Sequence, residues 1–195
     1  MVSILGKTTH LINGSWTVLY ATHPKIDRLF PIFAPVFAAD GTLYINGTLT
    51  VSGGDVPAVL ALNPNGSQRW LVRTLTSNLT AGSFNSGNYP PVAVGFDGTI
   101  YQTTPVGVAA LNPNGGINWQ ETMTGNNLGA PALSPDGRYV FVGSTDSNLY
   151  VLNSANGSIY ESFRTGGQVV DAPAVGSNGV VYFGSTDGNV YAVQP

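Results

Sequence analysis

Residues 130–150 read APALSPDGRYVFVGSTDSNLY, and residues 172–191 repeat them almost intact as APAVGSNGVVYFGSTDGNVY. The offset is 42 residues at the Ala-Pro pair and 41 at the Gly-Ser-Thr-Asp run. A self-match at about 40–45 residues is the period of four-stranded propeller blades. Each copy has two Gly-containing turns and no apolar stripe of 3.6-residue period, which argues against helical repeats. The stretch therefore predicts an all-β fold, a β-propeller of four-stranded antiparallel blades.

Two weaker copies of the stretch precede it, so the sequence predicts about four blades in a single propeller domain over residues 1–195. The fourth copy stops after its third strand, whereas the N-terminal segment carries Asn13-Gly14 followed by Trp16, like the start of a fourth strand. We therefore expect the N-terminal strand to complete the last blade. In the first copy, the turn before the third strand is expected to be enlarged from Asn46 to Pro57. The predicted blades are residues 34–75, 90–123, 130–165 and 171–195 plus 9–22.

The recurring side chains have structural explanations. Aspartate-glycine and asparagine-glycine pairs supply the positive φ angles of two-residue hairpins and thereby fix strand register. An aromatic residue at one repeat position is typical of packing between blades. Asp146 and Asp187 are expected to form hairpin turns, because their loops lack the dense Asp/Asn alternation of a calcium loop. The aromatic repeat position is occupied by Trp16, Trp70, Trp119 and Tyr160.

Composition excludes several classes of partner. Only 9% of the residues are charged and the net charge is -3, with no basic stripe, so nucleic acid is not expected as a partner. The chain has no cysteine, which excludes disulfides and thiolate metal sites. No apolar run is long enough to span a membrane, and the first residues lack the order of a signal peptide.

The candidate binding loop is residues 75–89, LTSNLTAGSFNSGNY, which interrupts the repeat and carries no charge. Long loops on rigid β-scaffolds often carry binding residues. Phe84 and Tyr89 offer stacking surface there, and Asn85 lies between them. A tolerated surface insertion is the alternative interpretation of this loop.

The repeat, from A-P-A through D/N-G and G-S-x-D-G to N-G-x-x-x-W, resembles that of pyrroloquinoline-quinone-type (PQQ-like) β-propellers. The resemblance is most specific at 130–165 and 171–195, and it implies the propeller fold. The family includes quinoprotein dehydrogenases and also members that bind no cofactor, such as the lipoprotein of the outer-membrane barrel-assembly machinery. Complete members usually have seven or eight blades. The resemblance therefore leaves three forms open: a fragment, half of a dimeric ring, or a compact four-bladed propeller.

The leading functional hypothesis is a non-catalytic scaffold or binding module, extracellular or in the periplasm or cell envelope. It follows from a regular repeat without a convergent set of catalytic residues, and it predicts a protein or small-molecule ligand and no cofactor. The first alternative is a fragment of a quinoprotein dehydrogenase, which would need PQQ with calcium. The family's cysteine pair has no counterpart here, because the chain has no cysteine. A lectin-like carbohydrate binder using the loop at 75–89 is the second alternative, and a homodimer that completes a ring is a further expectation.

Overall fold

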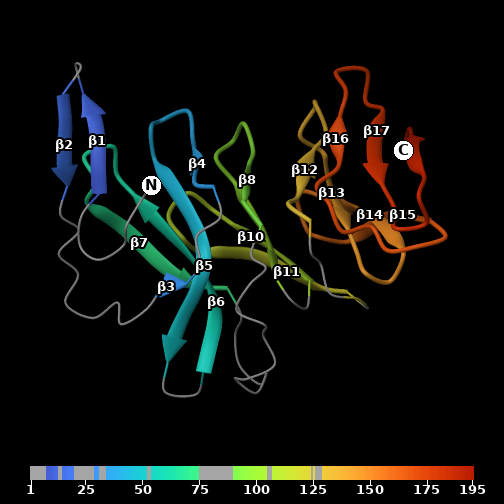
Figure 1. Cartoon of the computed structure of the whole chain (residues 1–195), viewed down its shortest axis with the longest axis horizontal. Coiled ribbons are helices and arrows are strands. Elements are labelled where there is room, and N and C mark those ends of the chain that lie inside the picture. Colours follow the sequence, from blue (N-terminus) through green and yellow to red (C-terminus); the bar gives the residue numbers. More distant parts are fainter. Residues whose placement is uncertain are drawn as a thin grey trace. The chain divides into compact units, whose positions relative to one another are not determined.

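A computed structural model describes residues 8–12, 15–19, 29–30, 34–51, 54–74, 90–104, 107–123, 125 and 129–195 (Figure 1). Within these ranges every regular element is a β-strand, and neighbouring strands pair antiparallel. Contacts divide the chain into two compact units, residues 1–86 and 87–195, each described below by itself. The predicted all-β class is confirmed.

The first unit contains a hairpin and a five-stranded sheet. The hairpin joins β1 (Thr8–Ile12) to β2 (Ser15–Leu19). The sheet has the order β3-β5-β6-β7, and β4 also pairs with β5. Its strands are β3 (Leu29–Phe30), β4 (Val36–Phe37), β5 (Leu43–Val51), β6 (Gly54–Leu62) and β7 (Gln68–Arg73).

The prediction of an enlarged turn from Asn46 to Pro57 is wrong. Strands β5 and β6 instead pair along their whole length, from Leu43 opposite Leu62 to Val51 opposite Gly54. This segment is rich in threonine and valine, whose branched side chains favour extended backbone. The hairpin therefore continues outward, and the first sheet has longer central strands than the sheets that follow.

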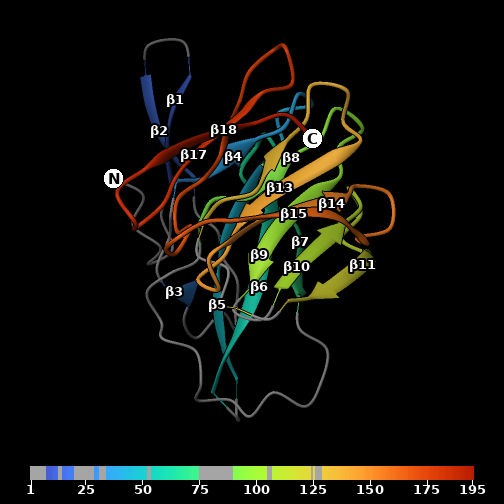
Figure 2. The same ribbon diagram turned by 90° about the vertical axis from the view of Figure 1, so that its right-hand side faces the viewer.

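The second unit consists of three sheets, each a simple antiparallel meander (Figure 2). Two of them have four strands, as the repeat predicts, and the last has three. The first sheet holds β8 (Ala93–Val94), β9 (Ile100–Thr104), β10 (Gly107–Leu111) and β11 (Ile117–Thr122). The second holds β12 (Ala132–Leu133), β13 (Tyr139–Gly143), β14 (Asn148–Asn153) and β15 (Ile159–Arg164). The third holds β16 (Ala174–Val175), β17 (Val181–Gly184) and β18 (Val190–Val193).

Strand register is conserved from sheet to sheet. In every sheet of the second unit, an alanine of the first strand lies opposite an aromatic residue of the second strand. The turn between these strands carries a glycine with positive φ, as the sequence predicts. Repeat positions can therefore be compared residue by residue. The three pairs are Ala93 with Tyr101, Ala132 with Phe141, and Ala174 with Tyr182.

The core of the second unit lies between neighbouring sheets. One cluster joins Tyr101 and Val108 of the first sheet to Val140 and Leu152 of the second. Another cluster joins the opposite face of the second sheet to the third sheet. Both faces of the middle sheet are thus buried, which explains why the central residues of its β13 and β14 strands are apolar or aromatic.

The expected completion of the last sheet by the N-terminal strand stays a prediction. In the structure β2 pairs with β1, and within the described residues β18 pairs with β17 alone. A single domain over residues 1–195 likewise stays a prediction.

Candidate functional site

A groove of about 570 Å³ lies within the second unit, where the first strand of each sheet turns into the second strand. Three successive repeats contribute to it, through the turns that follow β8, β12 and β16. Its apolar lining includes Val94, Leu133 and Val175, which occupy the same repeat position on these three strands. The repetition of the fold thus brings one apolar side chain from each blade to one place.

Two carboxylates lie on the lining of this groove, and each shapes its own turn. Asp97 accepts hydrogen bonds from the backbone N–H and the hydroxyl of Thr99, at 3.0 and 2.8 Å. Asp136 accepts a hydrogen bond of 2.7 Å from the Ser134 hydroxyl. It also pairs with Nε of Arg138 at 2.6 Å. Among the described residues, the lining of the groove therefore holds two acidic side chains and no basic one.

The hydrogen bond from Ser134, followed by those from the backbone and side chain of Arg138, lowers the pKa of Asp136 from 3.8 to about 2. Asp136 consequently carries its negative charge at neutral pH. Asp97 has no basic partner among the described residues. The groove therefore presents negative charge beside an apolar lining, a combination suited to binding rather than to proton transfer.

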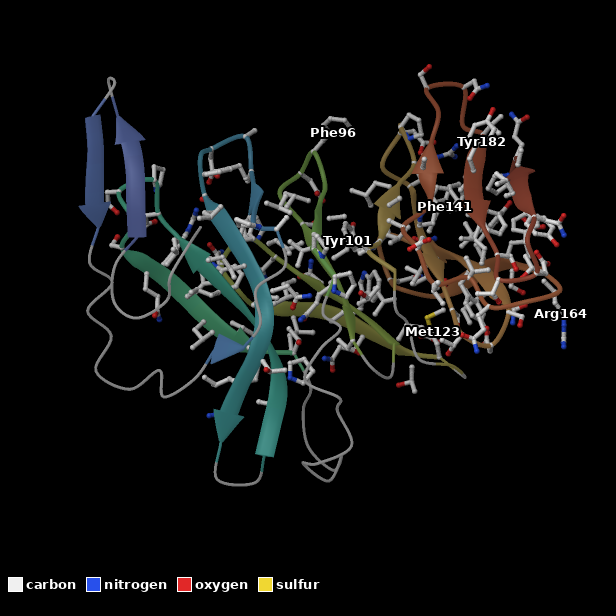
Figure 3. The ribbon with its side chains drawn as sticks, in the orientation of Figure 1. Phe96, Tyr101, Met123, Phe141, Arg164 and Tyr182 are labelled. Carbon is white, nitrogen blue, oxygen red and sulfur yellow. The ribbon has the colours of Figure 1, made fainter. Side chains whose placement is uncertain are left out.

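Phe96 is the most exposed large apolar side chain of the described residues, with 96% of its surface accessible. It extends from the turn after β8, at the tip of this hairpin, whereas Tyr101 lies lower on β9 (Figure 3). Burial raises the pKa of the Tyr101 hydroxyl, so this group is uncharged in the groove at neutral pH. An exposed aromatic ring beside a groove is available for contact with a partner.

A smaller groove of about 290 Å³ shares Ser134, Asp136 and Ser177 with the larger one. Its lining is more polar and includes Arg138, Asn178 and Gln194. The guanidinium of Arg138 lies over the Tyr139 ring, 5.6 Å from its centre. The two grooves together therefore form a surface with an acidic, apolar part and a mixed polar part.

The structure shows contacts for two of the three predicted tryptophans, Trp119 and Trp70. Trp119 donates a hydrogen bond of 2.8 Å to the carbonyl of Ser154 in the next repeat. Trp70 packs against Tyr44 of its own sheet, with ring centroids 5.6 Å apart. Trp16 lies on β2, in the N-terminal hairpin.

Tyr160 differs from the tryptophans at the same repeat position. Its ring lies 4.8 Å from that of Tyr139, yet 59% of its surface is accessible. A tyrosine suits a site where one part of the side chain packs on apolar groups and the other meets water. This position therefore combines packing with exposure in the third repeat.

Asp146 and Asp187 each fold the turn between the second and third strands. Asp146 accepts a hydrogen bond of 2.6 Å from the Tyr150 hydroxyl. Asp187 accepts one of 2.8 Å from the Tyr191 hydroxyl and another of 2.8 Å from the backbone N–H of Gly166. The Tyr191 hydrogen bond is the main cause that lowers the pKa of Asp187. Asp187 thus ties the last sheet to the segment that leads into it.

The candidate binding loop, residues 75–89, lies outside the described residues, and with it Phe84, Asn85 and Tyr89. Sequence reasoning missed the groove, because Asp97 and Asp136 stand in Asp-Gly pairs that predict only turns, and the repeat pattern assigns no role to Phe96. The available signal was a phenylalanine immediately before Asp97-Gly98, a place where the other repeats have alanine, proline or serine.

No group of three or more histidine, aspartate or glutamate side chains suitable for a metal occurs among the residues that the structure describes. The same part of the chain holds no helix long and apolar enough to cross a membrane.

Comparison with known proteins agrees with this architecture. Residues 106–195 match the PQQ-type repeat family described as outer membrane protein assembly factor BamB. BamB from Moraxella catarrhalis is 21% identical, with a TM-score of 0.61, over 82% of this chain and 48% of BamB. No curated protein matches the sequence.

Two computationally designed proteins have similar structures. Ika4 is 13% identical with a TM-score of 0.63, over 84% of this chain and 91% of Ika4. Ika8 is 14% identical with a TM-score of 0.64, over 93% of this chain and 50% of Ika8. The chain thus spans about half the length of BamB and of Ika8. The match to the PQQ-like repeat family covers residues 106–195, and the chain has the fold of the BamB-like propellers.

Proposed function

We propose that this chain is a non-catalytic β-propeller module that binds a protein partner at the cell envelope through the larger groove. The observation that carries the proposal is the composition of that groove, which joins an apolar lining and the exposed Phe96 ring to the carboxylates of Asp97 and Asp136. We expect the partner to present an extended segment whose apolar side chains contact the lining and whose basic side chains pair with the two carboxylates.

The use of the remaining polar residues supports a binding function. The carboxylates of Asp146 and Asp187 accept hydrogen bonds from tyrosine hydroxyls and backbone N–H groups of the repeat. Trp119 donates a hydrogen bond to the carbonyl of Ser154. These groups build and join the sheets, which leaves the turns around the groove as the place for specificity.

The proposed location has its support in the comparisons. The matching family is described as an outer membrane protein assembly factor, and BamB carries this name. An envelope protein that assembles others works by protein contacts, for which a rigid propeller with a shaped groove is suited.

The direct test is binding of the purified chain to an array of twelve-residue peptides of random sequence. Peptides that combine arginine or lysine with aromatic or aliphatic residues are expected to be enriched. Phe96→Ala and Asp97→Asn should each weaken their binding by about 10-fold or more, since each removes a contact of about 1.4 kcal/mol. Enrichment independent of both substitutions would refute the groove as the site.

The catalytic alternative is tested on the same preparation. The chain is mixed with PQQ, calcium and an artificial electron acceptor, and alcohols are offered as substrates. We expect no reduction of the acceptor above the protein-free control. Substrate-dependent reduction would identify the chain as part of a quinoprotein dehydrogenase and would overturn the proposal.

A further inference from the structure

An aspartate-glycine turn leads into each of the strands β5, β9 and β13, with its carboxylate at Asp40, Asp97 and Asp136. In the first of these turns the backbone N–H of Thr42 donates a hydrogen bond of 2.9 Å to Oδ1 of Asp40. Nη1 of Arg69, on β7, donates one of 3.1 Å to Oδ2 of Asp40 and one of 2.7 Å to the Thr42 hydroxyl. This turn therefore holds a guanidinium between a carboxylate and a hydroxyl.

The turn that leads into β9 has the same local geometry. The hydrogen bond that Oδ1 of Asp97 accepts from the backbone of the following threonine is 3.0 Å long. A Cβ on Gly98 would lie 3.0 Å from Cγ of Pro113, and a Cβ on Gly41 would lie 3.1 Å from Cγ of Pro64. The carboxylate and the turn that packs beside it are thus arranged alike in the two units.

The arginine of the first turn has no counterpart in the second. The strand pairing skips one residue of the last strand in both sheets, and this residue is Arg69 in β7 and Asn118 in β11. Asn118 is neutral and accepts a hydrogen bond of 3.5 Å from the Asn112 side chain. Among the described residues, Asp97 has no basic partner, whereas the other two turns each have an arginine of this chain.

The residue before the aspartate also differs in this turn. Phe96 is 96% exposed at the tip of its hairpin, whereas Ala39 and Pro135 stand at this place in the other two turns (Figure 3). Both Phe96 and Asp97 line the larger groove. A guanidinium can donate to a carboxylate through its edge and stack its face on an aromatic ring, whereas the ammonium of lysine is a point charge. A ring beside a carboxylate therefore suits arginine best.

We propose that Phe96 and Asp97 form a subsite for an arginine side chain of the protein partner. The inference rests on the proposed function of the groove and names the residue type that one end of the groove recognises. The guanidinium donates to Oδ2 of Asp97, as Arg69 does to the equivalent carboxylate, and its face lies on the Phe96 ring. Asp136 already pairs with Arg138 at 2.6 Å, so Asp97 is the carboxylate whose arginine has to come from the partner.

The test compares fluorescently labelled oligoarginine and oligolysine of equal length, titrated with the purified full chain at physiological ionic strength. The two peptides carry the same charge, so their difference in affinity reports the guanidinium. Oligoarginine is expected to bind about 10-fold more tightly. Asp97→Asn and Phe96→Ala should each abolish this preference, and Phe96→Tyr should keep it because the ring remains. Glu161→Gln, on an exposed residue of β15, is the control for the loss of one negative charge and should also keep it.

A further variant supplies the arginine from the chain itself. Asn118→Arg places an arginine at the strand position of Arg69, from which it should pair with Asp97. Oligoarginine should then bind no more tightly than oligolysine, although the lining of the groove is unchanged, since Asn118 does not line it. Asn118→Gln is the matched control, and it should retain the preference for oligoarginine.

Equal affinity of the wild type for the two peptides would overturn the arginine subsite, as would a preference that survives Asp97→Asn, Phe96→Ala or Asn118→Arg. The proposed function is judged separately by the peptide array. Array peptides that bind through Phe96 and Asp97 equally well with lysine in place of arginine would refute the subsite and leave the proposed function standing. An array without enriched peptides, beside an intact preference for oligoarginine, would do the reverse.

Discussion

Nε1 of Trp119 donates a hydrogen bond of 2.8 Å to the carbonyl oxygen of Ser154, and the indole ring lies against Gly157 in the same turn of the next repeat. A Cβ on Gly157 would collide with that ring. Trp119, at the aromatic repeat position, thus requires a glycine at position 157, because the indole ring occupies the space of a side chain there. This contact joins the first two sheets of the second unit through side chain and backbone together.

Gly157→Ala should destabilise the second unit by about 2–4 kcal/mol, because the added methyl group both meets the Trp119 ring and occupies a positive φ. Gly157 has φ of 79°, and Gly179 has φ of 83° with nothing within 4 Å of a Cβ. Gly179→Ala is therefore the matched control. It should lower the free energy of unfolding by only about 1 kcal/mol, from the strain of an alanine at positive φ. Urea unfolding at pH 7 measures both. Equal losses for the two variants would contradict the contact.

Trp119→Phe tests the hydrogen bond itself. The substitution keeps an aromatic ring but leaves the carbonyl of Ser154 without its donor. We expect a loss of about 1–3 kcal/mol in the free energy of unfolding, from the missing bond and the smaller ring. A loss below about 0.5 kcal/mol, the usual range of a surface change, would show that packing alone holds this position.

Gly143→Ala and Gly184→Ala separate a covered face from an exposed one. The first should destabilise the protein by roughly 1–3 kcal/mol, because its methyl group has no room beside Val169. The second should change the stability of a single chain by less than about 0.5 kcal/mol. Urea unfolding of both variants beside the wild type measures the two losses, and equal losses would contradict this difference between the two faces.

Asp136 predicts a pH dependence of stability. Its pKa lies at about 2 in the folded chain against an ordinary 3.8, so the folded state binds this proton less tightly than the unfolded state. The stabilisation by the ionised group is therefore complete above about pH 4 and is lost as the pH falls toward 2. Asp136→Asn should flatten this part of the profile of the urea midpoint against pH. Glu161→Gln, on an exposed strand residue, controls for the loss of one charge and should leave the profile unchanged.

The sequence predicted the sheets well because two kinds of signal agree in them. Turn glycines such as Gly137 and Gly179 mark the hairpins, and the apolar runs between them show that the sheets are covered on their faces. The third and fourth repeats, where both signals are complete, have the strands expected of them. The prediction of an enlarged turn at 46–57 is wrong because the residues there favour extended strands, which continue the hairpin.

The groove was not predictable in the same way. It depends on three turns coming together, and these turns are about 40 residues apart along the chain. Each turn residue has a sufficient local explanation, as Asp97 does in its hydrogen bonds with Thr99. The pattern of exposure also required the structure, since Val190 and Leu149 look alike in the repeat and differ only in what covers them.

The central claim, that the chain binds a protein through the groove, is tested most directly in cells of its source. A photo-activatable phenylalanine analogue at position 96 would be compared with the same analogue at Tyr160, which is exposed but does not line the larger groove. We predict a discrete adduct with an envelope protein from position 96 that is lost when Asp97 is replaced by lysine. The same adduct from both positions, or none from position 96 at normal expression, would contradict the claim.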